Sequence, residues 1–66
     1  MIKHLYEATV IKIDGDERLI PCCIVHTDIV AAISFMRENG YSVQAITKIK
    51  QVPKSKQIGW SFGKIL

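Results

Sequence analysis

The sequence predicts an α+β fold with the element order ββαββ. Three observations lead to this prediction. Two segments rich in β-branched residues flank Asp14-Gly15, a capped apolar stripe of helical spacing lies between residues 27 and 40, and apolar residues alternate again after Gly40. The expected architecture is a four-stranded antiparallel sheet, in the strand order 2-1-3-4, with one helix packed on one face.

The first two strands are expected at residues 5–13 and 18–26. Asp14-Gly15 between them suits the positive φ angles of a type I′ hairpin turn. Pro21 lies inside the second segment and has no N–H to donate to a neighbouring strand. The second strand is therefore expected at an edge of the sheet, or bulged at Pro21.

A helix is expected to begin at Thr27-Asp28 and to end at Asn39-Gly40. Thr27 is the expected N-cap, Asp28 places negative charge in the first turn, and Gly40 suits the left-handed residue that follows many helices. One stripe at i, i+3, i+4 and i+7 should face the sheet, namely Ile29, Ala32, Ile33 and Met36.

The third strand is expected at residues 41–52, followed by a loop at 53–56. Five of its residues alternate along one face, and Ile46 breaks that alternation: Tyr41, Val43, Ala45, Thr47 and Ile49. The tail at 57–66 alternates again and predicts a fourth strand. If the third strand lies beside the first, the order 2-1-3-4 follows and the second strand lies at an edge.

Composition predicts one soluble domain spanning residues 1–66. The apolar content of 48% is typical of a globular protein. No apolar run approaches the roughly 20 residues that cross a bilayer, and Glu7 interrupts the first apolar residues, so no signal peptide is expected. These features predict a cytoplasmic protein that does not bind membranes.

The sequence predicts no enzymatic activity, no metal and no cofactor. Cys22 and Cys23 are adjacent, so in a strand they point to opposite faces and do not bridge each other. His4 and His26 lie far apart in sequence, and the spacing of Cys23 from His26 puts them on opposite strand faces. Such histidines are more typical of packing or surface positions than of a catalytic pair.

The first hairpin is apolar on both faces, although one helix covers only one face of a sheet. Leu5, Ile11 and Ile13 lie on the face of the first strand opposite to Tyr6, Ala8 and Val10. We expect this second face to mediate self-association, most simply as a homodimer. The alternative is a bulge at Pro21 with the tail folded over the same face.

Charge is unevenly distributed along the chain. Residues 1–40 hold four basic and six acidic side chains, whereas residues 41–66 hold five lysines and no acid. Four of these lysines form an expected basic ridge along a hairpin of the third and fourth strands: Lys48, Lys50, Lys54 and Lys56. The ridge suits an anionic partner, although lysines on an edge strand also discourage aggregation.

Two functional hypotheses follow. The first is a small non-catalytic module that binds and modulates a larger protein, as an inhibitor or adaptor of the kind that phages and plasmids encode. That hypothesis rests on the short length of the chain and on its lack of catalytic groups, two properties that small accessory proteins often share. It does not follow from the physical chemistry of particular residues. The alternative is a small nucleic-acid-binding protein that uses the basic hairpin. The aromatic residues Tyr41, Trp60 and Phe62 fit core packing better than base stacking, because they align with other apolar residues.

Overall fold

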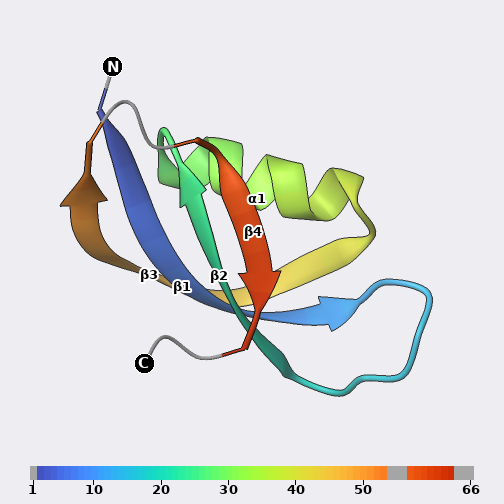
Figure 1. The fold of residues 1–66 in the computed structure, drawn as a ribbon. Coiled ribbons are helices and arrows are strands. Elements are labelled where there is room, and N and C mark those ends of the chain that lie inside the picture. The colour runs from blue at the N-terminus through green and yellow to red at the C-terminus, as the bar shows by residue number, and fades with distance from the viewer. Residues whose placement is uncertain (1, 54–56, 64–66) are drawn as a thin grey trace.

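Four strands and one helix make up the part of the chain that the computed structural model describes, residues 2–53 and 57–63. They are β1 (Lys3–Lys12), β2 (Ile20–His26), α1 (Ile29–Glu38), β3 (Tyr41–Val52) and β4 (Gly59–Phe62). The strands form one sheet in the order β3-β1-β2-β4, and every neighbouring pair is antiparallel. Helix α1 lies across one face of this sheet (Figure 1). The α+β class, the ββαββ order and the single helix-covered face are confirmed.

Strand β4 lies on a different side of the sheet from the expected one. β1 lies between β2 and β3, as the sequence predicts, but β4 pairs with β2 and not with β3. Its register places Trp60 opposite Ile24, on the helix-covered face. There the indole ring contacts Phe35 of α1, with ring centroids 5.8 Å apart. This packing favours the β2 edge for β4.

Pro21 consequently lies in an interior strand, and the expectation that β2 is an edge strand was wrong. The backbone explains why the sheet tolerates a proline here. The Pro21 carbonyl accepts a hydrogen bond from the Gly63 N–H at 2.9 Å, so the backbone of Pro21 faces the β4 side. Because Pro21 has no N–H, the second hydrogen bond that it could form with Gly63 is missing. β4 accordingly ends at Phe62, one residue before Gly63.

The connection between β1 and β2 is longer than the predicted turn at residues 14–17. Ile20 begins β2, two residues later than expected, and the loop of residues 13–19 projects from the body of the molecule (Figure 1). Among the described residues only Gly40 and Gly63 have positive φ angles. A type I′ turn requires positive φ at both central residues, so Asp14-Gly15 does not form one.

Helix α1 begins one residue later than expected. Asp28, not Thr27, is the N-cap, and its Oδ1 accepts a hydrogen bond from the Ala31 N–H at 2.8 Å. At the other end Gly40 has φ of +91° and its N–H donates to the Arg37 carbonyl. The predicted C-terminal signal, Asn39-Gly40, is thus confirmed.

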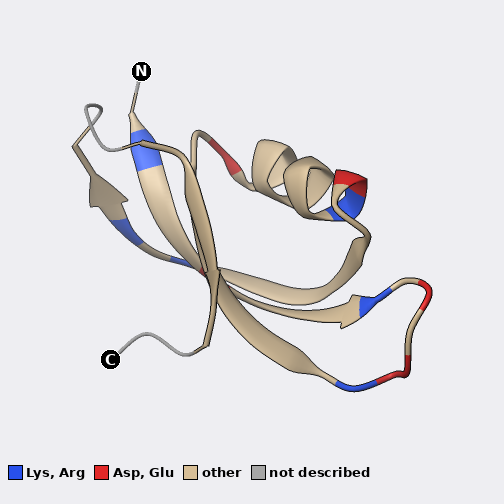
Figure 2. Cartoon of the chain, turned by 45° about the vertical axis from the view of Figure 1, so that its right-hand side comes forward, with Lys and Arg blue, Asp and Glu red and all other residues tan. Residues whose placement is uncertain are grey.

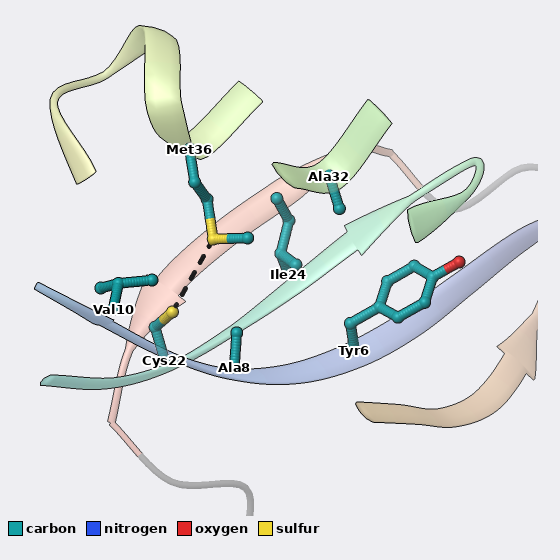
Figure 3. Packing of buried hydrophobic residues seen from close by; sticks show 7 residues of the cluster. All are labelled: Tyr6, Ala8, Val10, Cys22, Ile24, Ala32 and Met36. Carbon is teal, nitrogen blue, oxygen red and sulfur yellow. Dashed lines mark hydrogen bonds between the residues drawn. The ribbon is translucent and has the colours of Figure 1, made fainter. Parts of the chain in front are cut away.

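The core lies between α1 and the covered face of the sheet. Seven buried side chains form it (Figure 3): Tyr6, Ala8, Val10, Cys22, Ile24, Ala32 and Met36. Within the predicted helical stripe, Ala32 and Met36 are buried, whereas Ile29 at the first turn is 41% exposed. The helix directs Phe35 to the core in addition, so its buried side is rotated relative to the predicted stripe.

Strand β3 contains two irregularities that change which residues share a face. The register with β1 shifts between Thr9 and Val10 and again between Leu5 and Tyr6, so Gln44 and Ile49 are extra residues on β3. Ala45 therefore pairs with Thr9, on the face away from the helix, and Ile46 packs against the core. The residue that broke the predicted alternation, Ile46, marks the first bulge.

Candidate binding surfaces

The described residues offer no enclosed site for a small ligand. The surface of residues 2–53 and 57–63 holds no pocket, and no three His, Cys, Asp or Glu side chains within it gather as metal ligands do. The ten-residue α1 is the one helix in this part of the chain, and it is not long and apolar enough to cross a membrane. The candidate surfaces are therefore a sheet face and a sheet edge.

The two histidines, distant in sequence, are cross-strand partners. His4 and His26 lie opposite each other in the β1–β2 register, on the helix-covered face. Nδ1 of His26 accepts the backbone N–H of Thr27 at 2.9 Å, and its ring packs 5.9 Å from Phe35. The ring of His4 packs 6.0 Å from that of Tyr6. Both rings fill space between the sheet end and the helix start, as the packing interpretation expects.

The two cysteines point to opposite faces of β2, which confirms the expectation from their adjacency. The Cys22 thiol is buried in the core and lies 4.0 Å from the Met36 sulfur (Figure 3). The Cys23 thiol is 3.5 Å from the Ser61 hydroxyl on the open face. Burial raises the pKa of Cys22; the nearby Trp60 side chain lowers it and Cys23 raises it, both to a smaller extent.

We expect the two thiols to differ in reactivity toward Ellman's reagent. In the folded protein Cys23 reacts first, because it is only half-buried, whereas Cys22 is buried and its raised pKa keeps it protonated. Absorbance at neutral pH should show one fast thiol per chain, and two after unfolding in urea. A C23S variant should lose the fast reaction, and a fast thiol that persists in C23S would contradict the buried position of Cys22.

An aromatic cluster joins the two edge strands across the covered face. Tyr41 of β3 contacts Trp60 of β4 at 5.3 Å and Phe62 at 5.5 Å between ring centroids. β3 and β4 lie at opposite edges, so these contacts require a curled sheet whose edges approach each other. Tyr41 and Trp60 pack against the core, as expected, whereas Phe62 is 53% exposed. The rings of Tyr41 and Trp60 are thus engaged in contacts within the fold.

The face opposite the helix, which we call the open face, is uneven. Near one end Val25 and Val52 are buried, and Leu5, the partner of Val25, is half-buried. At the other end Ile13 is 50% exposed and Leu19 is 63% exposed. Of the three residues predicted for self-association, Leu5 thus lies at the buried end, and Ile11 and Ile13 at the exposed end.

We name the exposed end the hairpin arm, defined by Ile11, Ile13 and Leu19. Alternation along the strands places all three side chains opposite to the buried Val10 and to Ile20. Leu19 was not among the predicted residues. Its alternation with Ile20 in the sequence was a usable signal, but the length of the loop had to be known to judge its exposure.

The predicted basic ridge does not follow a hairpin, because β3 and β4 lie at opposite edges of the sheet. Lys48 pairs with Tyr6 and Lys50 pairs with Leu5, and these two neighbours on β1 face opposite sides of the sheet. The two lysines therefore flank the β3 edge from both faces and do not share one. Lys54 and Lys56, the other two members of the ridge, lie outside the described residues.

Charged residues of the sheet and of the β1–β2 loop lie at different ends of the molecule (Figure 2). Lys48 and Lys50 lie along β3, toward the end of the sheet where β1 begins. Asp14, Asp16 and Glu17 lie in the projecting loop at the other end, flanked by basic residues.

Scans against protein-family models, curated proteins and solved structures gave no match to this chain.

Proposed function

We propose that this chain is a non-catalytic module that binds a larger protein as an inhibitor or adaptor, in the cytoplasm, and that it does so as a homodimer. The observation that supports the proposal is the hairpin arm. Two of its three side chains, Ile13 and Leu19, are at least half exposed, on a sheet face that no described helix covers. An exposed apolar surface of this kind is typical of protein contacts.

The arm is suited to contact between two copies of the chain. Ile13 and Leu19 lie on a hairpin end that projects beyond the helix, so a second arm can approach without meeting α1 (Figure 1). Two arms related by a twofold axis would bury the same apolar side chains on each copy. The half-buried Ile11, the arm residue nearest the rest of the open face, would extend this contact.

A charge placed in the arm tests the homodimer. We expect the unmodified protein to sediment as a dimer at micromolar concentration, and L19E to weaken the dimer at least about tenfold, because each copy loses the burial of one leucine. V30E is the matched control, since Val30 is an apolar residue 70% exposed on the helix side. A monomer of 7.4 kDa for the unmodified protein would end the homodimer proposal.

Nucleic-acid binding is the second candidate. It is favoured by the absence of acidic residues from positions 41–66 and by Lys48 and Lys50 on an exposed edge strand. Against it, a nucleic-acid backbone is best met by several cations on one face, and these two lysines flank the edge from opposite faces. Binding to a generic DNA duplex that weakens steeply with salt, and that is lost when the four ridge lysines are replaced by glutamate, would favour this candidate.

A further inference from the structure

We propose that the outer edge of β3 binds an extended acidic segment of a protein partner, which adds to the sheet as a fifth strand. The inference rests on the proposed function as a protein-binding module and names the chemistry of its partner. It is carried by two observations. The first is a stretch of β3 backbone whose outer side pairs with no other strand among the described residues, and the second is the distribution of lysines around that stretch.

The hydrogen-bond alternation identifies which backbone groups face outward. The Ile13 N–H donates to the Gly40 carbonyl at 2.9 Å, so Ile13 faces the β3 side of β1. Alternate residues of β1 share this direction, so the backbone groups of Thr9 and Glu7 also point toward β3. There they form hydrogen bonds with the residues paired opposite them. Those partners are Ala45 and Thr47. The backbone groups of the residues between and beside them, Ile46 and Lys48, consequently point away from β1.

The stretch with outward groups is regular and accessible. Residues 45–48 lie between the two bulges of β3, and their pairing with β1 runs without interruption. β3 is the last strand of the sheet on this side, and Thr47, Lys48 and Ile49 are exposed. The edge of β4 on the opposite side is less suitable, because β4 has four residues and its ladder stops opposite Pro21.

Charge selects among the strands that could add here. Lys48 lies within the stretch, Lys50 follows it on the other face, and β3 itself contains no acid. On an added strand with carboxylates at alternate residues, one carboxylate would lie directly opposite Lys48 and its neighbours diagonally, and cross-strand pairs of opposite charge are stabilising. A lysine on an edge strand hinders neutral or basic strands but attracts an acidic one.

A second copy of the chain fits this edge poorly. In a twofold antiparallel pair of β3 strands centred on Thr47 or Lys48, the two copies of Lys48 would lie diagonally or directly opposite each other. Like charges in these positions are destabilising. The edge therefore suits a different chain, whereas the hairpin arm at the other end of the molecule suits a second copy.

Amide hydrogen exchange measured by NMR tests the proposal on the full chain. The probe is a six-residue peptide that alternates glutamate with threonine, with blocked ends, and the matched control peptide has glutamine in place of glutamate. We expect the acidic peptide to slow exchange at Ile46 and Lys48, whose N–H groups point outward. Thr47, which already bonds to β1, should change little. Protection elsewhere, equal protection by the glutamine peptide, or equal protection by a DNA duplex would overturn the proposal.

Substitutions at Lys48 separate the backbone contribution from the charge. K48A removes the charge and keeps the N–H, whereas K48P also removes the outward N–H without removing a bond to β1. We expect K48P to bind the acidic peptide about fivefold more weakly than K48A, the effect of one hydrogen bond. Equal binding by K48A and K48P would show that the peptide does not add as a strand.

A second variant keeps the test independent of the fold of K48P. K48E retains the outward N–H and reverses the charge, and it should lose binding of the acidic peptide while circular dichroism stays unchanged. Binding that survives in K48E would exclude the edge as the acidic site. Failure of these experiments leaves the hairpin arm untouched, because sedimentation of L19E measures the proposed self-association separately.

Discussion

Replacing Ile24 with alanine is expected to lower the free energy of unfolding by about 2–5 kcal/mol, the usual cost of removing a large aliphatic side chain from a core. Ile24 is 1% exposed and lies at the centre of the core, below Ala32 of the helix (Figure 3). The stability of a chain of this length is only about 3–10 kcal/mol. We therefore expect the I24A variant to be largely unfolded in moderate urea, where the unmodified protein stays folded.

Equilibrium unfolding in urea, followed by far-ultraviolet circular dichroism, measures this effect. V30A is the control, because Val30 is 70% exposed on the same fold and its truncation should change stability by less than about 0.5 kcal/mol. An I24A midpoint equal to that of V30A would contradict the central position of Ile24 in the core.

Replacing Trp60 with alanine is expected to cost about 3–5 kcal/mol and to release β4 from the sheet. Trp60 contacts Phe35, Tyr41 and Phe62, so its ring connects the helix and both edge strands. β4 pairs with β2 over only four residues. The aromatic contacts must therefore supply much of what holds this strand in place.

W60F separates the ring from its polar group. The indole N–H of Trp60 is buried without a hydrogen-bond partner among the described residues, although it lies near enough to affect the pKa of Cys22. Phenylalanine keeps most of the ring contacts and removes this unsatisfied donor, whose burial is itself costly. We expect W60F to lie within about 1.5 kcal/mol of the unmodified protein, measured by the same urea unfolding. A loss in W60F as large as in W60A would show that the indole group itself holds β4.

The sequence predicted the local elements of the fold well, because each carries its signal in neighbouring residues. The strand at 41–52 and the end of the helix at Asn39-Gly40 match the structure. Alternation and capping are short-range properties, and they do not depend on which strands later pair. The side of the sheet that β4 joins depends on contacts between Trp60 and Phe35, which are distant in sequence.

The candidate surfaces were less predictable than the fold. Lys48 and Lys50 alternate in the sequence and were expected on one face, but the bulge at Ile49 places them opposite neighbouring residues of β1. Bulges leave only weak signals in a single sequence: the misplaced Ile46 indicated the bulge at Gln44, but not the bulge at Ile49 that separates the two lysines. The exposure of Leu19 depends on the loop between β1 and β2, whose length the Asp14-Gly15 pair did not indicate.

The central position of β1 has a consequence for how the chain folds. Only the β1–β2 pairing joins consecutive strands, whereas β1–β3 and β2–β4 join strands separated by other elements of the chain. A hairpin forms in about 1–10 μs, but pairings between distant segments must first close long loops, which slows folding. We therefore expect the β1–β2 hairpin to form first, β3 to join it with the helix, and β4 to complete the sheet afterwards. The folding rate should accordingly respond more to changes in the first hairpin than to changes in β4.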